Sequence, residues 1–295
     1  MKKIITIAVL ILSILPVFCQ EYKIIDSKMK KEIELTEMVE RLGEFDVIFF
    51  GEFHGNKILH SLEIELLKMF YRNNKNLIIS LEMFERDVQP VLDKYLNNEI
   101  PEADFLTVSR PWSNYKTDYK PLIEFAKENE LTVVAANIPR RYASMISKQG
   151  MNALDSLSVE EKKFVAKKHK VFDDEYKKLF IQTMKNNMAH SSKMPKGMMM
   201  NLDLIYAAQC IKDDTMAESI LKYQRIPPRR KVIHYNGDFH SRKHLGTAQK
   251  IQILEPMLKV AVITPLMCEE ELSWKDEDLL EGEFLILIKE EIEKH

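Results

Sequence analysis

The segment Val47–Glu63 reads VIFFGEFHGNKILHSLE. Its apolar run ends at Gly51, and the acid Glu52 and the imidazole His54 follow at once. A short continuous apolar run is typical of a strand that is covered on both faces. The glycine lets the backbone turn sharply just before the polar side chains.

A second segment, Lys231–Lys243, repeats this arrangement as KVIHYNGDFHSRK. Here the apolar run ends at Gly237, and Asp238 and His240 stand at the same offsets as the acid and imidazole of the first segment. In an open parallel sheet, ligands bind at the carboxyl ends of the strands. The repeat therefore predicts two buried strands that deliver similar chemistry to one edge of a sheet.

The whole chain has 295 residues, of which 45% are hydrophobic, so it can bury a sizeable core. Its formal net charge is -2 and its pI is about 6.5. This balance provides no basic face for nucleic acid and no acidic tail, so we expect no nucleic-acid partner.

The first residues, MKKIITIAVLILSILPVFCQ, have the build of a secretory signal peptide over residues 1–19. The apolar core from Ile4 to about Leu15 is shorter than the ~20 residues of a membrane span. We expect cleavage after Cys19 and an exported chain that is periplasmic, outer-membrane-associated or secreted. Lipidation of Cys19 is the alternative, although Phe18 stands where a lipidation box has a small residue.

Strands alternate with helical patterns along most of the chain. This alternation predicts an α/β fold with a mainly parallel sheet flanked by helices. The predicted strands are Asp46–Phe50, Leu77–Leu81, Thr132–Ala136, Lys231–Tyr235, Leu258–Ile263 and Phe284–Ile288. The predicted helices between them are Ile58–Tyr71, Pro121–Asn129 and Arg140–Gln149.

Residues 151–225 show no strand signal. They predict a largely helical insertion or lid, with helices at Val159–Lys168, Asp174–Met188 and Asn201–Tyr223, inside one domain of residues 20–295. Cys210 and Cys268 are the cysteines that remain in this domain. They either pair or stay free thiols, and the sequence leaves both open.

Four consecutive predicted strands end in polar groups, because Glu82 follows the second strand and Asn137 and Arg140 follow the third. Imidazoles and carboxylates that converge suit a divalent metal or general acid–base chemistry. The candidates for either role are Glu52, His54, Glu82 and His240.

Other histidines have weaker signals. His60 and Glu63 lie one turn apart on the first predicted helix, either on its solvated face or at the rim of the site. His244 is interpreted as a loop residue and His169 as an exposed one.

Two segments could form a wall for a flat ligand. Six methionines lie between Met184 and Met200, where they either fill the core or line a pocket for a large apolar ligand such as haem. The segment Ser109–Leu122, SRPWSNYKTDYKPL, gathers aromatic side chains and Arg110, as a ligand wall or as an ordered loop. The CxxCH signature of covalent attachment is absent, so any haem would be bound non-covalently.

Five motifs, in this order, resemble the ChaN-like haem-binding uptake family, which is related to the Tiki proteins and more remotely to the erythromycin esterases. They are GEFHG, SLEMFERD, the run from RPWSNY to ANIPRR, AAQCIKDDTMAESI and NGDFHSRKHLG. The resemblance spans about Asp46 to Ile288 and implies an α/β core, haem binding in the bacterial envelope and haems held between two protomers. It also makes envelope uptake components possible partners.

The Tiki branch of the resemblance implies instead a metal-dependent peptidase that uses Gly-x-x-His motifs and a glutamate. By motif, Gly51 with His54 and Gly237 with His240 match the two Gly-x-x-His motifs. The acidic positions match Glu52 and Glu82, and the helix motif matches Gln209, Asp214, Met216 and Ala217. For haem, the candidate contacts are Tyr142, Tyr119, His190, Arg140 and Met216. A haem carrier and a metal-dependent hydrolase thus remain as two hypotheses.

Overall fold

The computed structural model describes residues 21–190 and 201–289. The predicted signal peptide, its cleavage and the lipidation of Cys19 lie outside these residues. Eight strands form one sheet in the order β2-β1-β8-β7-β3-β6-β4-β5. They are β1 (Tyr22–Asp26), β2 (Lys31–Ile33), β3 (Val47–Glu52), β4 (Leu77–Glu85), β5 (Thr132–Asn137), β6 (Lys231–Gly237), β7 (Val260–Cys268) and β8 (Phe284–Lys289).

The sheet is parallel from β8 to β5, and only the edge pairs β1–β2 and β1–β8 are antiparallel. This confirms the predicted α/β class with its mainly parallel sheet. All six predicted strands are present, and each is longer than expected. The prediction missed β1 and β2, which are short strands at one edge of the sheet.

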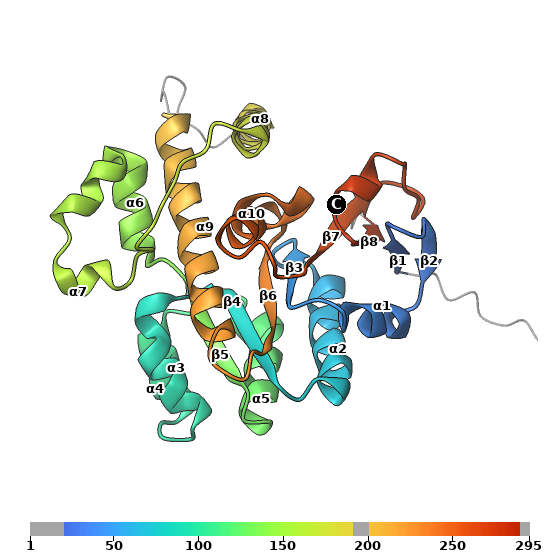
Figure 1. Cartoon of the computed structure of the whole chain (residues 1–295), viewed down its shortest axis with the longest axis horizontal. Helices are drawn as coiled ribbons and strands as arrows, with labels where there is room; N and C mark the ends of the chain where they lie inside the picture. Colours follow the sequence, from blue (N-terminus) through green and yellow to red (C-terminus); the bar gives the residue numbers. More distant parts are fainter. Residues whose placement is uncertain (1–20, 191–200, 290–295) are drawn as a thin grey trace, which may run out of the picture.

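Helices cover both faces of the sheet (Figure 1). They are α1 (Leu35–Leu42), α2 (Lys57–Asn73), α3 (Gln89–Leu96), α4 (Glu102–Ser109), α5 (Lys120–Glu128), α6 (Arg140–Gln149), α7 (Val159–Lys162), α8 (Glu175–His190), α9 (Leu202–Gln224) and α10 (Gly246–Leu254). In the described part of the chain, none of the helices has the length and apolar character needed to cross a membrane.

Strand β3 shows why the two layers form. Its side chains point alternately to opposite faces, so Ile48 and Phe50 enter the core under α1 to α5, while Val47 and Phe49 enter the core under α9 and α10. All four side chains are 0% exposed. A strand buried on both faces therefore reads as a continuous apolar run, as the sequence showed.

Residues 151–225 form helices and no strand where the structure describes them, as predicted. One of these helices belongs to the layer that covers the sheet and is not a lid. Helix α9 packs Met216 and Ile220 into the core on one face of the sheet, so it is one of the covering helices (Figure 1). Helix α7 ends at Lys162, not at Lys168 as predicted. Beyond it, the backbone N–H groups of Ala166 and Lys167 donate to side chains of α9, so these groups do not continue the helical hydrogen bonds.

Candidate functional site

The strands that carry the predicted polar groups are neighbours in the sheet. They stand in the order β3-β6-β4-β5, so their carboxyl ends form one edge. Glu82 lies inside β4 and not after it, which corrects the predicted strand end at Leu81. The pairing of β4 with β5 shifts register between Leu81 and Glu85. Such a bulge redirects side chains, and here it coincides with the position of Glu82.

Glu52 and His54 form the first pair at this edge. Glu52 Oε1 lies 2.6 Å from His54 Nδ1 and accepts a 2.6 Å hydrogen bond from the Tyr119 hydroxyl. Burial opposes ionisation of Glu52. Its hydrogen bonds outweigh burial and lower its pKa, and the hydrogen bond with His54 contributes most. Burial likewise opposes charge on His54, but Glu52 and the nearby Glu82 outweigh it and raise the pKa of His54. His54 is half-exposed, so a carboxylate orients an imidazole that solvent and ligands can reach.

Glu82 and His240 form the second pair, with a third residue that the sequence did not indicate. His240 Nε2 lies 3.2 Å from Glu82 Oε1, and His240 Nδ1 lies 2.7 Å from Asp213 Oδ1. Burial disfavours charge on His240, but the two carboxylates outweigh it and raise its pKa to about 10. Burial also disfavours charge on Glu82, yet His240 holds the pKa of Glu82 well below its usual range. The pair is therefore an ion pair at neutral pH.

Gly237 allows the two pairs to approach each other. A β-carbon at Gly237 would lie 2.9 Å from His54 Cε1 and Nε2, and 3.6 Å from Glu82 Oε2. The backbone N–H of Gly237 also donates a 2.8 Å hydrogen bond to Glu82 Oε2. The glycine is therefore required by the close packing of the His54 ring against the end of β6.

Three polar residues near the strand ends, Asp238, His244 and Asn137, lie outside the two pairs. Asp238 turns to Arg242, with Oδ2 3.2 Å from the guanidinium Nε, and burial raises its pKa to about 7. His244 lies 3.0 Å from Glu283. Asn137 accepts a 2.8 Å hydrogen bond from the backbone N–H of Ile138. Asn137 and Asp238 thus serve local structure although their positions in the sequence match the site.

His60 and Glu63 lie inside the protein. They are 5% and 0% exposed, which excludes the solvated helix face as their position. His60 Nδ1 lies 2.9 Å from Glu63 Oε2 and 3.6 Å from Glu52 Oε2. Burial and the neighbouring Glu52 raise the pKa of Glu63 well above its usual value. The spacing of three residues on one helix indicated that they share a face, but not that this face is buried. His169 is exposed, as predicted.

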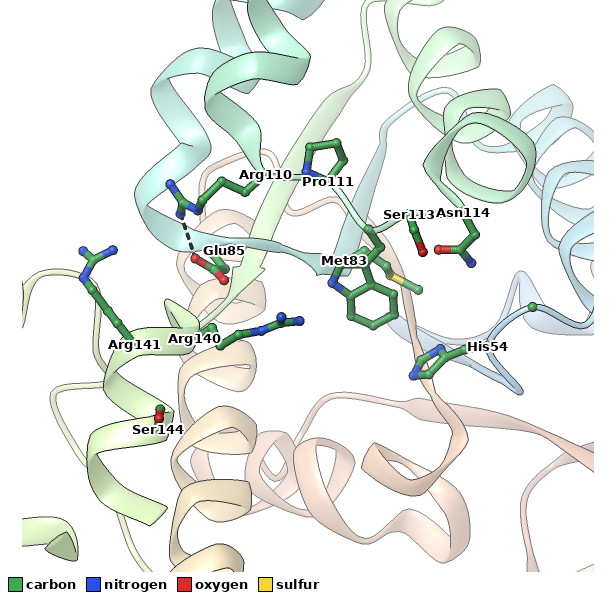
Figure 2. A pocket seen from close by; sticks show the side chains of 12 residues that line it. His54, Met83, Glu85, Arg110, Pro111, Ser113, Asn114, Arg140, Arg141 and Ser144 are labelled. Atoms are coloured by element: carbon green, nitrogen blue, oxygen red, sulfur yellow. Dashed lines mark hydrogen bonds and ion pairs between the residues drawn. The ribbon is translucent and has the colours of Figure 1, made fainter. Parts of the chain in front are cut away.

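A pocket of about 1020 Å³ opens beside His54. Its wall includes Trp112, Met83 and three arginines, Arg110, Arg140 and Arg141. In Figure 2, Arg140 points into the pocket from the start of α6, while Arg110 is joined to Glu85. The rings of Trp112 and His54 pack edge to face, with ring centroids 4.8 Å apart. The Ser109–Leu122 segment thus forms a pocket wall, and it runs from the end of α4 through a helical turn at Tyr115–Tyr119 into α5.

The family model described as haem-binding uptake, Tiki superfamily, ChaN matches residues 38–251, which include both strand-end pairs. The chain belongs to this ChaN family. No curated protein matches the chain.

A solved structure of the same family has the same fold. It is described as cofacial heme binding to ChaN of Campylobacter jejuni, and it superposes with a TM-score of 0.67 at 20% identity over 92% of this chain and 98% of that chain. The toxin effector domain RRSP of Vibrio vulnificus matches with a TM-score of 0.44 at 16% identity, over 78% of this chain and 36% of that one. A mutant of the erythromycin esterase EreC matches with a TM-score of 0.48 at 10% identity, over 84% of this chain and 77% of that one. The last two likenesses are too weak to support a functional conclusion.

In this ChaN-family chain, the haem contacts predicted from the sequence lie in different places. Tyr119 and Tyr142 are each 1% exposed, and Met216 is 0% exposed within the core under α9. His190 ends α8, and its side chain lies outside the described part of the structure, as does most of the Met184–Met200 segment. Arg140 is exposed and lines the pocket. Cys210 and Cys268 are both free, so they do not form a disulfide in this structure.

Proposed function

We propose that this chain binds haem non-covalently in the pocket beside His54 and serves haem or iron uptake as an exported protein. Membership of a haem-binding uptake family supports this proposal. The observation that carries it is the wall of the pocket, which combines Trp112 and Met83 with three guanidinium groups. A haem has a flat apolar face and two carboxylates, and such a wall offers contacts to both.

Arg140 is the best-placed anchor for a haem carboxylate. Arg110 is bonded to Glu85 and Asp87, and Arg141 is bonded to Asp87. Among the ion pairs of the described residues, none involves Arg140, and its side chain points into the pocket (Figure 2). A guanidinium that is not already paired can form a bidentate bond with an incoming carboxylate.

We also propose that haem is shared between two copies of the chain. The solved ChaN structure is described as binding haem cofacially. A pocket open on one side can present the exposed face of its haem to the haem of a second copy. Export rests on the N-terminal segment MKKIITIAVLILSILPVFCQ.

Replacing Arg140 with alanine is expected to weaken haem binding by about 10- to 100-fold, because a hydrogen bond to a charged group contributes about 1.5–3 kcal/mol. The measurement is a titration of residues 20–295 with haem, followed by the Soret absorbance and by the molecular mass in solution. Lys148→Ala is the matched control, since Lys148 is an exposed cation on the same helix and does not line the pocket.

If Arg140→Ala binds haem as tightly as the wild type does, haem does not bind in this pocket. Haem uptake that never saturates in the wild-type protein would reject the haem-binding function itself. A haem complex that keeps the mass of one chain would reject the shared arrangement.

A second candidate function is acid–base hydrolysis of an ester or peptide. It is favoured by one observation, which is that Glu52 orients His54 while the Glu82–His240 pair lies beside it at the same edge. A base held by a carboxylate is the arrangement that activates a nucleophile or water. Its substrate would enter through the same pocket.

For this second function, His54→Ala is expected to abolish turnover of chromogenic ester or peptide substrates while the far-UV circular dichroism stays unchanged. Arg140→Ala should keep hydrolysis of small neutral substrates, because a neutral substrate offers no carboxylate for Arg140 to bind. Unchanged turnover in both His54→Ala and His240→Ala would contradict the hydrolase function, whatever the outcome of the haem titration.

A further inference from the structure

A compact group of possible metal ligands lies behind the pocket, between the end of β3 and the start of α2. Glu52, His60 and Glu63 each offer one ligand atom, and these atoms all lie within 4.8 Å of one another. Two ligands of one transition-metal ion at about 2.0–2.2 Å are at most ~4.4 Å apart, so small side-chain shifts suffice to close the group. The group differs from the set predicted from the strand ends, which included His54, Glu82 and His240.

Each of the two carboxyl groups keeps one buried oxygen that receives no hydrogen bond from any other described residue. The two groups interact with each other, which requires one of them to hold a proton. Glu52 Oε1 is bonded to His54 and Tyr119, whereas Glu52 Oε2 is the buried oxygen without such a bond. Glu63 Oε2 is bonded to His60, whereas Glu63 Oε1 is the buried oxygen without such a bond. Both residues are at most 1% exposed. A buried acceptor that receives no hydrogen bond is costly, and a bound cation would remove that cost and take the place of the shared proton.

The carboxyl groups around His60 meet no lysine or arginine among the described residues. Three carboxyl groups surround it, because Asp118 Oδ2 lies 3.3 Å from His60 Nε2 in addition to the two glutamates. Among the ion pairs of the described residues, these three acids meet only histidines. Buried charges are normally paired or coordinate a metal.

We propose that Glu52, His60 and Glu63 bind one divalent transition-metal ion. Coordination through His60 Nδ1 requires Nε2 to carry the proton. Nε2 would then give up the 3.3 Å hydrogen bond that it accepts from the backbone N–H of Gly55 and donate to Asp118 Oδ2, 3.3 Å away. Asp118 is itself held by a 2.6 Å hydrogen bond from the Asn114 side chain. An imidazole that ligates a metal and donates its other N–H to a carboxylate is the usual supporting arrangement in metal sites.

The ligand set selects the class of ion. One imidazole with two carboxylates suits Zn²⁺, Mn²⁺ or Fe²⁺, whereas Mg²⁺ and Ca²⁺ prefer oxygen ligands alone. The two carboxylates balance the charge of a divalent ion. Because Glu52 is also bonded to His54, the ion would hold Glu52 in place and position His54 at the pocket wall.

The test is a titration of the chelator-treated wild-type chain with Zn²⁺, Co²⁺ and Mg²⁺ by calorimetry, with the visible spectrum of the Co²⁺ complex as a second readout. We expect one Zn²⁺ or Co²⁺ per chain and binding of Mg²⁺ at least about 100-fold weaker. In Glu63→Gln, binding should fall by more than the ~10- to 100-fold that is usual for changes outside the ligand shell. The glutamine oxygen can still accept the bond from His60, so this variant should fold.

Glu65→Gln is the matched control, because Glu65 is exposed on the same helix, and it should bind metal like the wild type. Asp118→Asn, which keeps the three ligands and alters the support of His60, should lose about 10- to 100-fold in affinity. Stoichiometric metal that binds equally well to Glu63→Gln would overturn the site. So would a wild-type chain that takes up no metal, which would instead assign a shared proton to the two glutamates. The Soret titration of Arg140→Ala is independent of these results.

Discussion

Replacing Asp213 with alanine is expected to lower the free energy of unfolding by about 3–5 kcal/mol, because it breaks a buried ion pair from one side. Asp213 is 0% exposed and accepts hydrogen bonds of 2.9 Å from the Tyr176 hydroxyl and 2.8 Å from the Thr247 hydroxyl, besides its 2.7 Å contact with His240. Without it, these donors lose their partner inside the protein. The midpoint temperature of thermal unfolding should therefore fall by about 6–20 °C.

The measurement is urea or thermal unfolding followed by circular dichroism. Asp203→Ala is the control on the same helix, because Asp203 is exposed and its pair with Lys177 should contribute less than ~1 kcal/mol. If Asp213→Ala lowers the free energy of unfolding no more than the control does, the Asp213 carboxylate does not stabilise the charged His240.

The stability of the wild-type chain is expected to fall with rising pH relative to that of His240→Gln. The carboxylates of Glu82 and Asp213 outweigh burial and raise the pKa of His240 to about 10, well above its ordinary value of about 6.5. A raised histidine pKa means that the folded state holds a proton that the unfolded state has released. The stabilisation is therefore complete below about pH 6.5 and is lost as the pH rises toward 10.

The quantity to measure is the difference in unfolding free energy between the wild-type protein and His240→Gln at a series of pH values. It should shrink by about 1.4 kcal/mol per pH unit in the middle of this window. Asp238, whose pKa is raised to about 7, titrates in both proteins, so its effect cancels in the difference. If the unfolding free energies of the two proteins change in parallel from pH 6.5 to 10, His240 is not charged in the folded state.

The Glu52–His54 pair could be predicted because the signals that specify it are local, whereas the partners of His240 are distant in the sequence. A continuous apolar run, a glycine and an acid two residues before a histidine stand next to one another in the sequence. Asp213 could not be predicted as the partner of His240, because it lies on a long helix with polar neighbours and no local signal distinguishes it. His60 and Glu63 could be placed on one helix face, but their burial depends on the helical turn that carries Asp118 and Tyr119.

By itself, the sequence determined the α/β class, the identity of the parallel strands and the residues at their carboxyl ends. These follow from the periodicity of apolar residues and from glycines, which act within a few residues of the chain. Only the tertiary structure decided that β6 inserts between β3 and β4, which brings His240 to Glu82 and His54. Strand order depends on contacts between distant segments, and the same holds for the buried carboxylates, whose neighbours and charge are set by what packs around them.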